Sequence, residues 1–364
     1  MKAAVFTSVP YVGPAERGVW PVPKQTYSSE IAEKSMEQSL EQFQLADELG
    51  FDWVTLAEHH FAPMSLTPNP MVMAGAVAQR VRRAKIALLG ADIPILNPVR
   101  VAEEFAMLDT LTGGRIIAGM LRGTSNEYVT YNTNPSESRE RFEEALELIV
   151  RAWTEPQPFG WQGRYYENRS ISIWPKPVQQ PHPPIYMSGS SPEAGEFAAR
   201  RRISIGFAVT TVPLAREAVA HYRRQANEWG WDPCPDDVLY RSAIHVADTD
   251  EQAMEDLQPL AQRRGSYSTS NKALDEVAAS AGYYGRDTAT QRGRLEGGRS
   301  LQERIERGEL LAGGPATVAA QIRSMRHELG CGILDLIFSP LGRDKTLRAL
   351  ELFGTKVLPA IREL

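Results

Sequence analysis

The segment from residue 85 to residue 123 constrains the fold more than any other part of the chain. It reads KIALLGADIPILNPVRVAEEFAMLDTLTGGRIIAGMLRG: two apolar runs flank a stretch in which Val101, Phe105 and Leu108 recur at helical spacing. A strand, a helix and a strand with short glycine and proline joints form a βαβ unit, whose two strands are parallel. Arg122 follows the second strand, at the edge where parallel sheets bind ligands.

The same alternation of strand and helix continues along the whole chain. Eight βα units predict a (β/α)8 TIM barrel, and all 364 residues are expected to form this one domain. An open doubly wound sheet is the alternative, but no G-x-G-x-x-G motif follows the first strand. The strands are expected at residues 3–9, 51–57, 86–95, 115–121, 185–188, 204–210, 238–247 and 332–339.

Four segments interrupt the alternation. Residues 11–26 form a long loop after the first strand, and residues 124–135 are predicted to be a polar loop. Residues 160–177 alternate aromatic and polar side chains, as an excursion hairpin does. Residues 263–308 are polar and rich in glycine, serine and arginine, which predicts an insertion or lid after strand seven.

Charge and cysteine content exclude several classes of function. The formal net charge is -5 with both signs interspersed, which argues against binding nucleic acid or an anionic membrane. Cys234 and Cys331 have no metal-like spacing, so a reduced, cytoplasmic protein is expected. No apolar run reaches the roughly 18 residues of a membrane span, and the N-terminus lacks the pattern of an export signal.

Two histidines follow the second predicted strand, in the run Glu58-His59-His60. Adjacent residues of an extended segment point to opposite sides, so at most one histidine is expected to face the strand-end cavity. The alternative is a loop pair satisfied by hydrogen bonds. Asp92 and Asp109 could add ligands for a metal, but no H-x-H or H-E-x-x-H spacing occurs, so no metal is predicted.

A second group of residues indicates an anion site. Arg122 and Arg139 could converge on one anion, although Arg139 could instead pair with Glu143 on a solvated helix face. Residues 188–192, SGSSP, precede a helix whose first amides could bind an anion, or Ser191 is simply a helix cap. Together these features suggest a phosphorylated cofactor or substrate.

The residues above, in this order, resemble those of bacterial luciferase and the wider luciferase-like flavin monooxygenases. The resemblance covers residues 3–247 and 311–342. The motifs that carry it are GFDWVTLAEHHF (50–61), NPVRVAEE (97–104), LDTLTGGR (108–115), LRG (121–123), SR (138–139) and PPIYMSGSS (183–191).

The resemblance implies a cofactor and the residues that bind it. The family uses reduced FMN or, in one branch, the deazaflavin F420. A phosphate site is implied at Arg122, Arg139, Gly189, Ser190, Ser191 and the amide near Ala194. A non-prolyl cis peptide is implied at Leu89-Gly90, beneath the flavin ring, and catalytic positions at His59 and its neighbour His60.

The resemblance also implies a reaction. A separate NAD(P)H:flavin reductase would supply reduced FMN, which reacts with O2 to give a flavin C4a-hydroperoxide, and one oxygen passes to an apolar organic small molecule. His59 would move a proton, the lid would exclude water, and the chain is expected to form a homodimer.

One residue departs from the luciferase pattern. Luciferase has a reactive cysteine before its Arg-Gly pair, and this chain has Leu121 there, so light emission is not expected. The alternatives are an F420-dependent oxidoreductase, a non-catalytic luciferase-like partner subunit and, more distantly, a metallohydrolase. His59, Arg122 and Arg139 favour a working site over the partner subunit.

Overall fold

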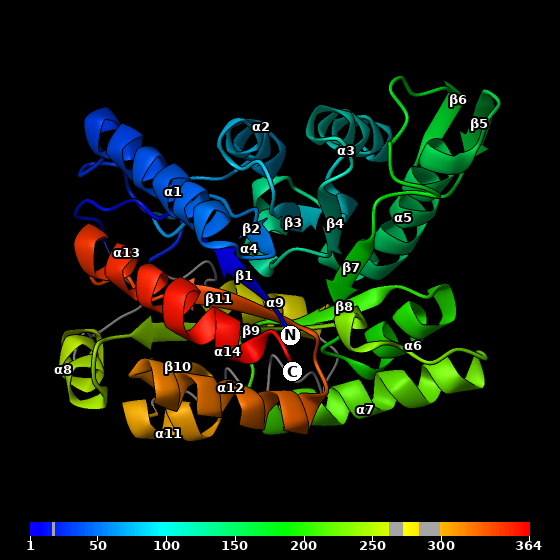
Figure 1. Ribbon diagram of the computed structural model, residues 1–364. Coiled ribbons are helices and arrows are strands. Elements are labelled where there is room, and N and C mark those ends of the chain that lie inside the picture. The colour runs from blue at the N-terminus through cyan, green and yellow to red at the C-terminus, as the bar shows by residue number, and fades with distance from the viewer. Residues whose placement is uncertain (17–18, 262–271, 284–298) are drawn as a thin grey trace.

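Eight parallel strands close into a barrel in the computed structural model, which describes residues 1–16, 19–261, 272–283 and 299–364 (Figure 1). Each barrel strand is hydrogen-bonded to the next in parallel register, and the last pairs with the first. The predicted (β/α)8 barrel is therefore confirmed. The barrel strands are β1 (Lys2–Phe6), β2 (Trp53–Leu56), β3 (Lys85–Asp92), β4 (Ile116–Leu121), β7 (Ile185–Ser188), β8 (Ser204–Phe207), β9 (Val238–Val246) and β11 (Ile333–Phe338).

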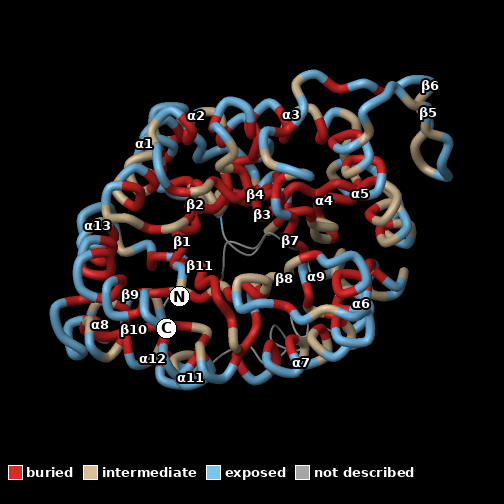
Figure 2. Tube along the Cα trace, turned by 45° about the vertical axis from the view of Figure 1, so that its right-hand side comes forward, coloured by how far each residue is buried: buried red, intermediate tan, exposed pale blue. Residues whose placement is uncertain are grey.

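Helices surround the barrel and turn their exposed sides outward, while buried residues follow the strands (Figure 2). Side-chain caps and proline at the first turn begin many of them, as at Asn69 and Asn97, and Gly50 and Gly113 end two in the left-handed conformation. The helices are α1 (Ser29–Leu49), α2 (Pro70–Arg80), α3 (Pro98–Thr112), α4 (Ser125–Thr130), α5 (Ser138–Thr154), α6 (Pro192–Arg201), α7 (Val212–Glu228), α8 (Asp250–Ala261), α9 (Lys272–Ser280), α11 (Leu301–Glu306), α12 (Pro315–Leu329), α13 (Arg343–Leu352) and α14 (Leu358–Ile361), with 3-10 turns at Ile93–Ile95, Pro135–Glu137 and Pro235–Asp237 and a π-helical turn at Phe353–Val357.

Among the described residues, three short strands lie outside the barrel order. The predicted excursion is an antiparallel hairpin of β5 (Phe159–Gln162) and β6 (Glu167–Ile171). The strand β10 (Leu310–Gly313), which was not predicted, pairs in parallel with the end of β9. Its four buried residues extend the sheet directly before α12.

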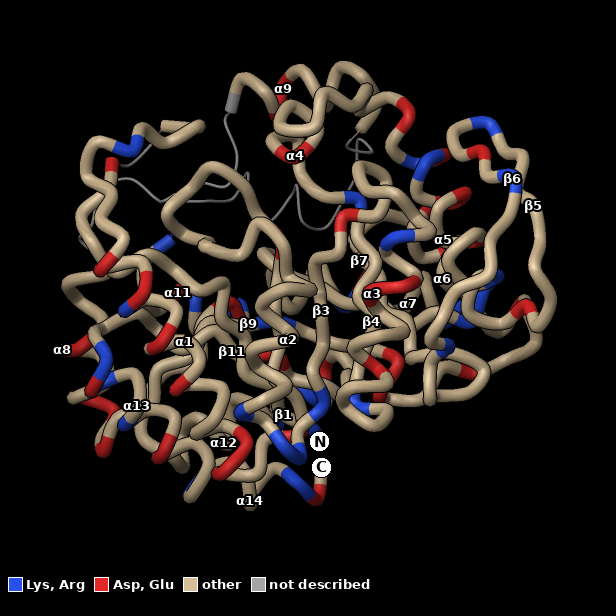
Figure 3. The backbone as a smooth tube through the Cα atoms, turned by 90° about the horizontal axis from the view of Figure 1, so that it is seen from above, with Lys and Arg blue, Asp and Glu red and all other residues tan. Residues whose placement is uncertain are grey.

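The predicted insertion at 263–308 lies only partly within the described residues, which include 272–283 and 299–308. Seen from above, α9 lies beside α4 at the mouth of the barrel (Figure 3). Ser125 Oγ of α4 donates a hydrogen bond to Asp275 Oδ1 of α9 at 2.6 Å. The described part of the insertion is therefore attached next to the end of β4.

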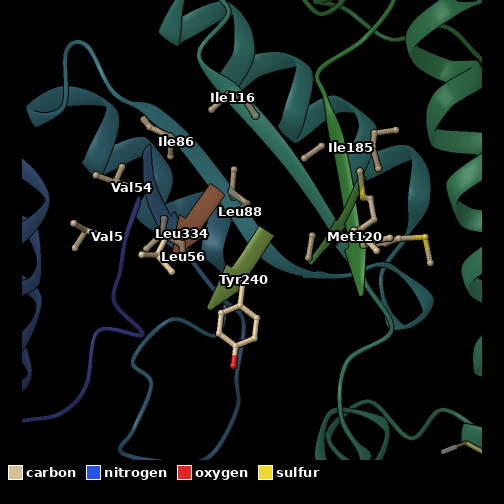
Figure 4. Packing of buried hydrophobic residues seen from close by; sticks show 14 of the residues in the cluster. Val5, Val54, Leu56, Ile86, Leu88, Ile116, Met120, Ile185, Tyr240 and Leu334 are labelled. Atoms are coloured by element: carbon tan, nitrogen blue, oxygen red, sulfur yellow. The ribbon is translucent and has the colours of Figure 1, made fainter. Parts of the chain in front are cut away.

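Alternation along the strands separates two packed layers. Outward side chains such as Val5, Val54, Leu88 and Ile116 meet the helices (Figure 4). Inward apolar side chains fill part of the barrel interior; they are Ala4, Trp53, Ala87, Leu89, Ile117, Tyr186, Leu239 and Ile333. Polar side chains occupy other inward positions, where Asp335 accepts from Thr55 and pairs with Arg241. In the part of the chain that the structure describes, no helix is both long and apolar enough to span a membrane.

The backbone near Gly90 corrects one expectation. The Leu89–Gly90 bond is trans, since the cis bonds among the described residues all precede prolines. The register between β3 and β4 instead shifts between Leu89 and Ala91. A Cβ at Gly90 would lie 2.6 Å from the Glu58 nitrogen, so this irregularity brings β3 against β2 more closely than a larger residue would permit.

Candidate functional site

His59 is held by a carboxylate from another part of the mouth. Its Nδ1 lies 3.3 Å from Oε1 of Glu127, which belongs to the first turn of α4. The other oxygen, Oε2, accepts the Thr124 amide at 2.8 Å and the Thr124 hydroxyl. The side chain of Glu127 is 1% exposed and that of His59 is 22% exposed.

His60 points to a different partner. Its Nε2 lies 3.1 Å from Oε1 of Glu58, and both side chains are buried. The ring also packs edge-on against Tyr131, with ring centroids 5.2 Å apart. The two histidines therefore diverge, as expected of adjacent extended residues, and each is paired with its own glutamate.

A third acid completes a buried cluster with these glutamates. The Asp92 amide donates to Glu58 Oε2 at 3.3 Å, and the Asp92 carboxyl lies against Gly123, where a Cβ would be only 3.1 Å from its carbon. Burial, and then the negative charges of Glu58 and Glu127, raise the pKa of Asp92 well above its usual range.

The two glutamates of this cluster have opposite pKa shifts. Burial raises the pKa of Glu58, although the hydrogen bonds from His60 and the Asp92 amide oppose that shift. Burial alone would also raise the pKa of Glu127, but the hydrogen bond and charge of His59, with the two Thr124 hydrogen bonds, lower it. Glu127 is therefore the acid of the cluster that stays ionised most readily.

Glu127 was not predicted, because residues 124–135 were expected to be a loop. The structure has the helix α4 there, and Thr124-x-x-Glu127 forms its capping box. That four-residue signature was present in the sequence and could have revealed both the helix and the buried glutamate.

Arg122 lies at the end of β4, on another side of the mouth. Its Nη1 donates to the Tyr283 carbonyl at 3.1 Å and to Ser138 Oγ at 3.5 Å. The guanidinium carbon lies 4.7 Å from the centre of the Tyr283 ring, and the Tyr283 hydroxyl donates to the Gly123 carbonyl. The partner of Arg122 thus comes from the predicted insertion.

Arg139, in the first turn of α5, is directed to the start of α6. Its Nη2 lies 3.8 Å from Oε2 of Glu193, with side chains 38% and 55% exposed. No ion pair joins Arg139 to Glu143 in the described residues, in contrast to the alternative considered above. Burial would raise the pKa of Glu193, but its own amide, Ser191, Arg139 and Arg122 together lower it. The Glu193 carboxylate therefore lies in the field of both arginines.

The Ser-Gly-Ser-Ser turn before α6 lies tightly against β8. A Cβ at Gly189 would be 2.8 Å from the Ile205 side chain. Ser191 caps α6 by accepting the Ala194 amide at 3.2 Å, so that amide, expected at a phosphate, is engaged within the helix. The hydroxyl of Ser190 lies 3.2 Å from that of Ser188.

The predicted residues thus fall into three places. His59 and His60 join the acid cluster; Arg139 and Ser191 contact Glu193, which also feels the charge of Arg122; Leu89 lies in the inner wall of β3, and Gly90 lies at the register shift beside it. A cavity of about 410 Å³ between the first turns of α2 and α3 reaches Glu58 and Tyr131. Within the described ranges, no three His, Cys, Asp or Glu side chains are arranged to hold a metal ion.

Comparison with known proteins identifies relatives across most of the chain. The family model described as luciferase-like monooxygenase matches residues 11–331. The oxygenase component of a flavin-dependent trigonelline monooxygenase from Acinetobacter baylyi is 26% identical over 60% of this chain and 61% of its own. The 4-hydroxyprotoasukamycin monooxygenase of Streptomyces nodosus subsp. asukaensis is 25% identical over 89% of this chain and 86% of its own. The chain spans about half to three fifths of the length of several such relatives.

Solved structures show the same fold along nearly the full chain. The monooxygenase RslO1 from Streptomyces bottropensis superposes with a TM-score of 0.77 at 26% identity and covers 99% of both chains. The oxygenating constituent of 3,6-diketocamphane monooxygenase from Pseudomonas putida, in complex with FMN, gives 0.76 at 18% identity over 99% of this chain and 98% of its own. An F420-dependent secondary alcohol dehydrogenase gives 0.71 at 17% identity over 99% of both chains.

Proposed function

The chain belongs to the luciferase-like monooxygenase family, and on that premise we propose that it is the oxygenase component of a two-component, FMNH2-dependent monooxygenase. It would use O2 to insert one oxygen atom into an apolar organic small molecule. One observation supports this function above the others: at the start of α6 the Glu193 carboxylate lies 3.8 Å from Arg139, is bound by Ser191 of the preceding turn and feels the charge of Arg122. These donors suit the phosphate of FMN.

The chemistry of these residues fits the cofactor. Two guanidiniums and the hydroxyls of Ser190 and Ser191 are donors of the kind that bind phosphate at a helix start. Leu89 and the backbone at Gly90 would form an apolar wall for the flavin ring, and Gly189 lets the turn approach β8 closely. The Ala194 amide already donates a hydrogen bond to Ser191 Oγ. Ala194 would therefore lie beside the phosphate in the first turn of α6 without donating to it.

Reduced flavin, when bound, would supply the electrons that activate O2. The chain would contribute binding of the phosphate, exclusion of water and movement of a proton by His59. His60, buried against Glu58 and Tyr131, would hold the strand-end segment in place. Leu121, which replaces the reactive cysteine of luciferase, gives the pocket an apolar side chain at that point.

Two partners are part of the proposal. A relative named as an oxygenase component supports a separate NAD(P)H:flavin reductase as the source of reduced flavin. A homodimer is supported by large apolar side chains exposed on the outer faces of two neighbouring helices. These are Val72 on α2, 73% exposed, and Met107 and Leu111 on α3, 50% and 62% exposed.

Anaerobic titration of the chain with FMNH2, followed by flavin fluorescence, tests the cofactor. We expect a dissociation constant in the micromolar range, and an affinity no tighter than millimolar would refute the assignment. Oxygen uptake then separates the two branches of the fold: uptake with FMNH2 supports the monooxygenase. Substrate oxidation without oxygen uptake, with F420, would support the F420-dependent alternative that the dehydrogenase fold suggests.

A further inference from the structure

We propose that Glu127 is the positioning residue of His59: its carboxylate fixes the ring with the proton on Nδ1, so that Nε2 is the nitrogen that exchanges a proton with the reacting molecule. This inference rests on the function proposed above, because it names the group that prepares His59 for that reaction. The position of the His59 proton is also a property of the protein without flavin, and it can be tested separately.

The geometry holds Glu127 in a single orientation. One oxygen, Oε2, is bound by the amide and hydroxyl of Thr124, and the other, Oε1, lies 3.3 Å from His59 Nδ1. The carboxylate is buried and belongs to the backbone-anchored first turn of α4. A carboxylate fixed by three contacts orients the imidazole at little entropic cost.

The neighbouring charges keep this carboxylate ionised. Asp92 and Glu58 lie close enough for their charges to interact with Glu127, and a buried set of three acids does not ionise fully. Asp92 is the acid that accepts a proton most readily, because its carboxyl has no hydrogen bond among the described residues. Oε2 of Glu127 accepts from both the amide and the hydroxyl of Thr124, and these two donors favour its ionised form whatever the tautomer of His59.

An ionised carboxylate can only accept, so Nδ1 of His59 must donate. The remaining nitrogen, Nε2, has no hydrogen-bond partner in the part of the chain that the structure describes. His59 is 22% exposed, whereas His60 is 4% exposed and uses Nε2 for its own glutamate. The two adjacent rings are thus bound through opposite nitrogens, and only His59 has Nε2 available to a ligand.

A purely structural role for Glu127, as the cap of α4, is the alternative, and the chain provides a matched control. Glu303 forms the same capping box with Ser300 at the start of α11, with distances of 2.8 and 2.9 Å to the Ser300 amide and hydroxyl, and among the described residues no histidine bonds to it. Thr124→Ala provides a second control, because it weakens the cap of α4 and removes one of the two donors to Oε2, while the backbone amide of residue 124 still holds the Glu127 carboxylate beside His59.

The test is the tautomer of His59, read from the 15N chemical shifts of histidine-labelled protein without flavin and assigned with His59→Gln. We expect the Nδ1–H form in the wild type and in Thr124→Ala and Glu303→Gln. In Glu127→Gln we expect a mixed or reversed tautomer and a turnover about 10- to 100-fold lower, with the affinity for FMNH2 unchanged.

Two results would overturn the proposal. One is the Nε2–H form in the wild type, a result that needs no variant to fold. The other is a folded Glu127→Gln protein with the wild-type tautomer and turnover. If the protein bound no FMNH2 but showed the predicted tautomers, the proposed function would fail while the placement of the His59 proton would stand.

Discussion

The two sides of the barrel mouth differ in how their polar groups are partnered. On the side of β2, β3 and α4, the two histidines and three acids are mostly buried and contact one another. On the side of β4, α5 and α6, the arginines contact a backbone carbonyl of the insertion and a half-exposed glutamate. On the first side the carboxylates and histidines already pair with one another and Nε2 of His59 is left available, whereas an anion could replace the partners of the second.

This difference assigns separate tasks to the two sides. A buried, charge-paired cluster can hold a proton in a defined place, because its groups are already desolvated and oriented. Half-buried arginines whose partners are a carbonyl, a hydroxyl and an exposed glutamate can bind a cofactor phosphate and release it. The cofactor would thus be exchangeable, which suits an enzyme that receives reduced flavin from another protein.

The largest effect should come from the histidine that is paired with Glu127. Replacing His59 by glutamine is expected to lower product formation about 100- to 10,000-fold, because a general acid–base group contributes that much, while FMNH2 still binds. The comparison variant is His60→Gln, which should chiefly lower the melting temperature, since His60 is buried against Glu58. If His59→Gln turned over substrate at the wild-type rate, the chain would be better described as a non-catalytic partner subunit.

On the arginine side, Arg122→Ala should weaken the binding of FMNH2 about 10- to 100-fold, since a charge-assisted hydrogen bond contributes about 1.5–3 kcal/mol. Arg80→Ala is the control, because Arg80 pairs with Glu37 between α2 and α1, away from the predicted phosphate site. Equal affinities of the two variants, measured by anaerobic titration, would remove Arg122 from the phosphate site.

Replacing Glu193 is expected to strengthen the binding of FMNH2, a smaller effect than that of Arg122→Ala and of opposite sign. If its carboxylate competes with phosphate for the arginines, Glu193→Gln should bind FMNH2 up to about 5-fold more tightly, the limit for an exposed ion pair. Glu147→Gln is a matched control, because Glu147 and Arg201 form a similar pair between the same two helices at 3.7 Å. Weaker binding by Glu193→Gln would mean that Glu193 supports Arg139 instead of competing with the phosphate.

The acid cluster should also have a distinct dependence of stability on pH. The pKa of Asp92 is higher in the folded chain than its ordinary value of 3.8, so the folded state binds more protons and loses stability as the pH rises from 3.8 through the folded-state pKa. Asp92→Asn should lack this loss in urea unfolding measured across pH.

The pKa of Asp47 is shifted in the opposite direction from that of Asp92, because it is lowered in the folded chain. Burial would raise its pKa, but the amides of residues 82–84 lower it, so its contribution to stability is present above pH 3.8 and is lost as the pH falls through the lower folded-state pKa. The difference in unfolding free energy between the wild type and Asp47→Asn should therefore shrink toward acid pH.

For the acid cluster, the same dependence of stability on pH in Asp92→Asn and in the wild type would contradict the raised pKa of Asp92.

Much of this architecture was predictable from the sequence. Long apolar runs predicted the eight barrel strands, and apolar periodicity between Asn and Gly ends predicted helices such as α3. The run Glu58-His59-His60 was predicted to follow a strand, and it does. The arginine side was predicted through residue types that suit an anion, and the assignment of Arg122 and Arg139 to a phosphate stays a prediction; in the structure Arg139 lies 3.8 Å from Glu193, and Arg122 contacts Ser138 and Tyr283.

The missed features are short or depend on contacts between distant residues. The six residues of α4 are too few to show periodicity, so Glu127 appeared to belong to a loop. The strand β10 has only four residues and is specified by its pairing with β9. The register shift at Gly90 depends on how closely the end of β2 approaches β3. The ion pair between Arg139 and Glu193 depends on how α5 packs on α6. Both are contacts between distant segments, so local sequence patterns do not predict them.

The central claim, that this mouth binds a flavin through its phosphate, is tested most directly by comparing FMNH2 with reduced riboflavin in anaerobic titrations of the wild-type chain. The two ligands differ only in the phosphate. We predict that FMNH2 binds at least about 100-fold more tightly, which corresponds to two or more charge-assisted hydrogen bonds. Equal affinity for the two flavins would contradict the account.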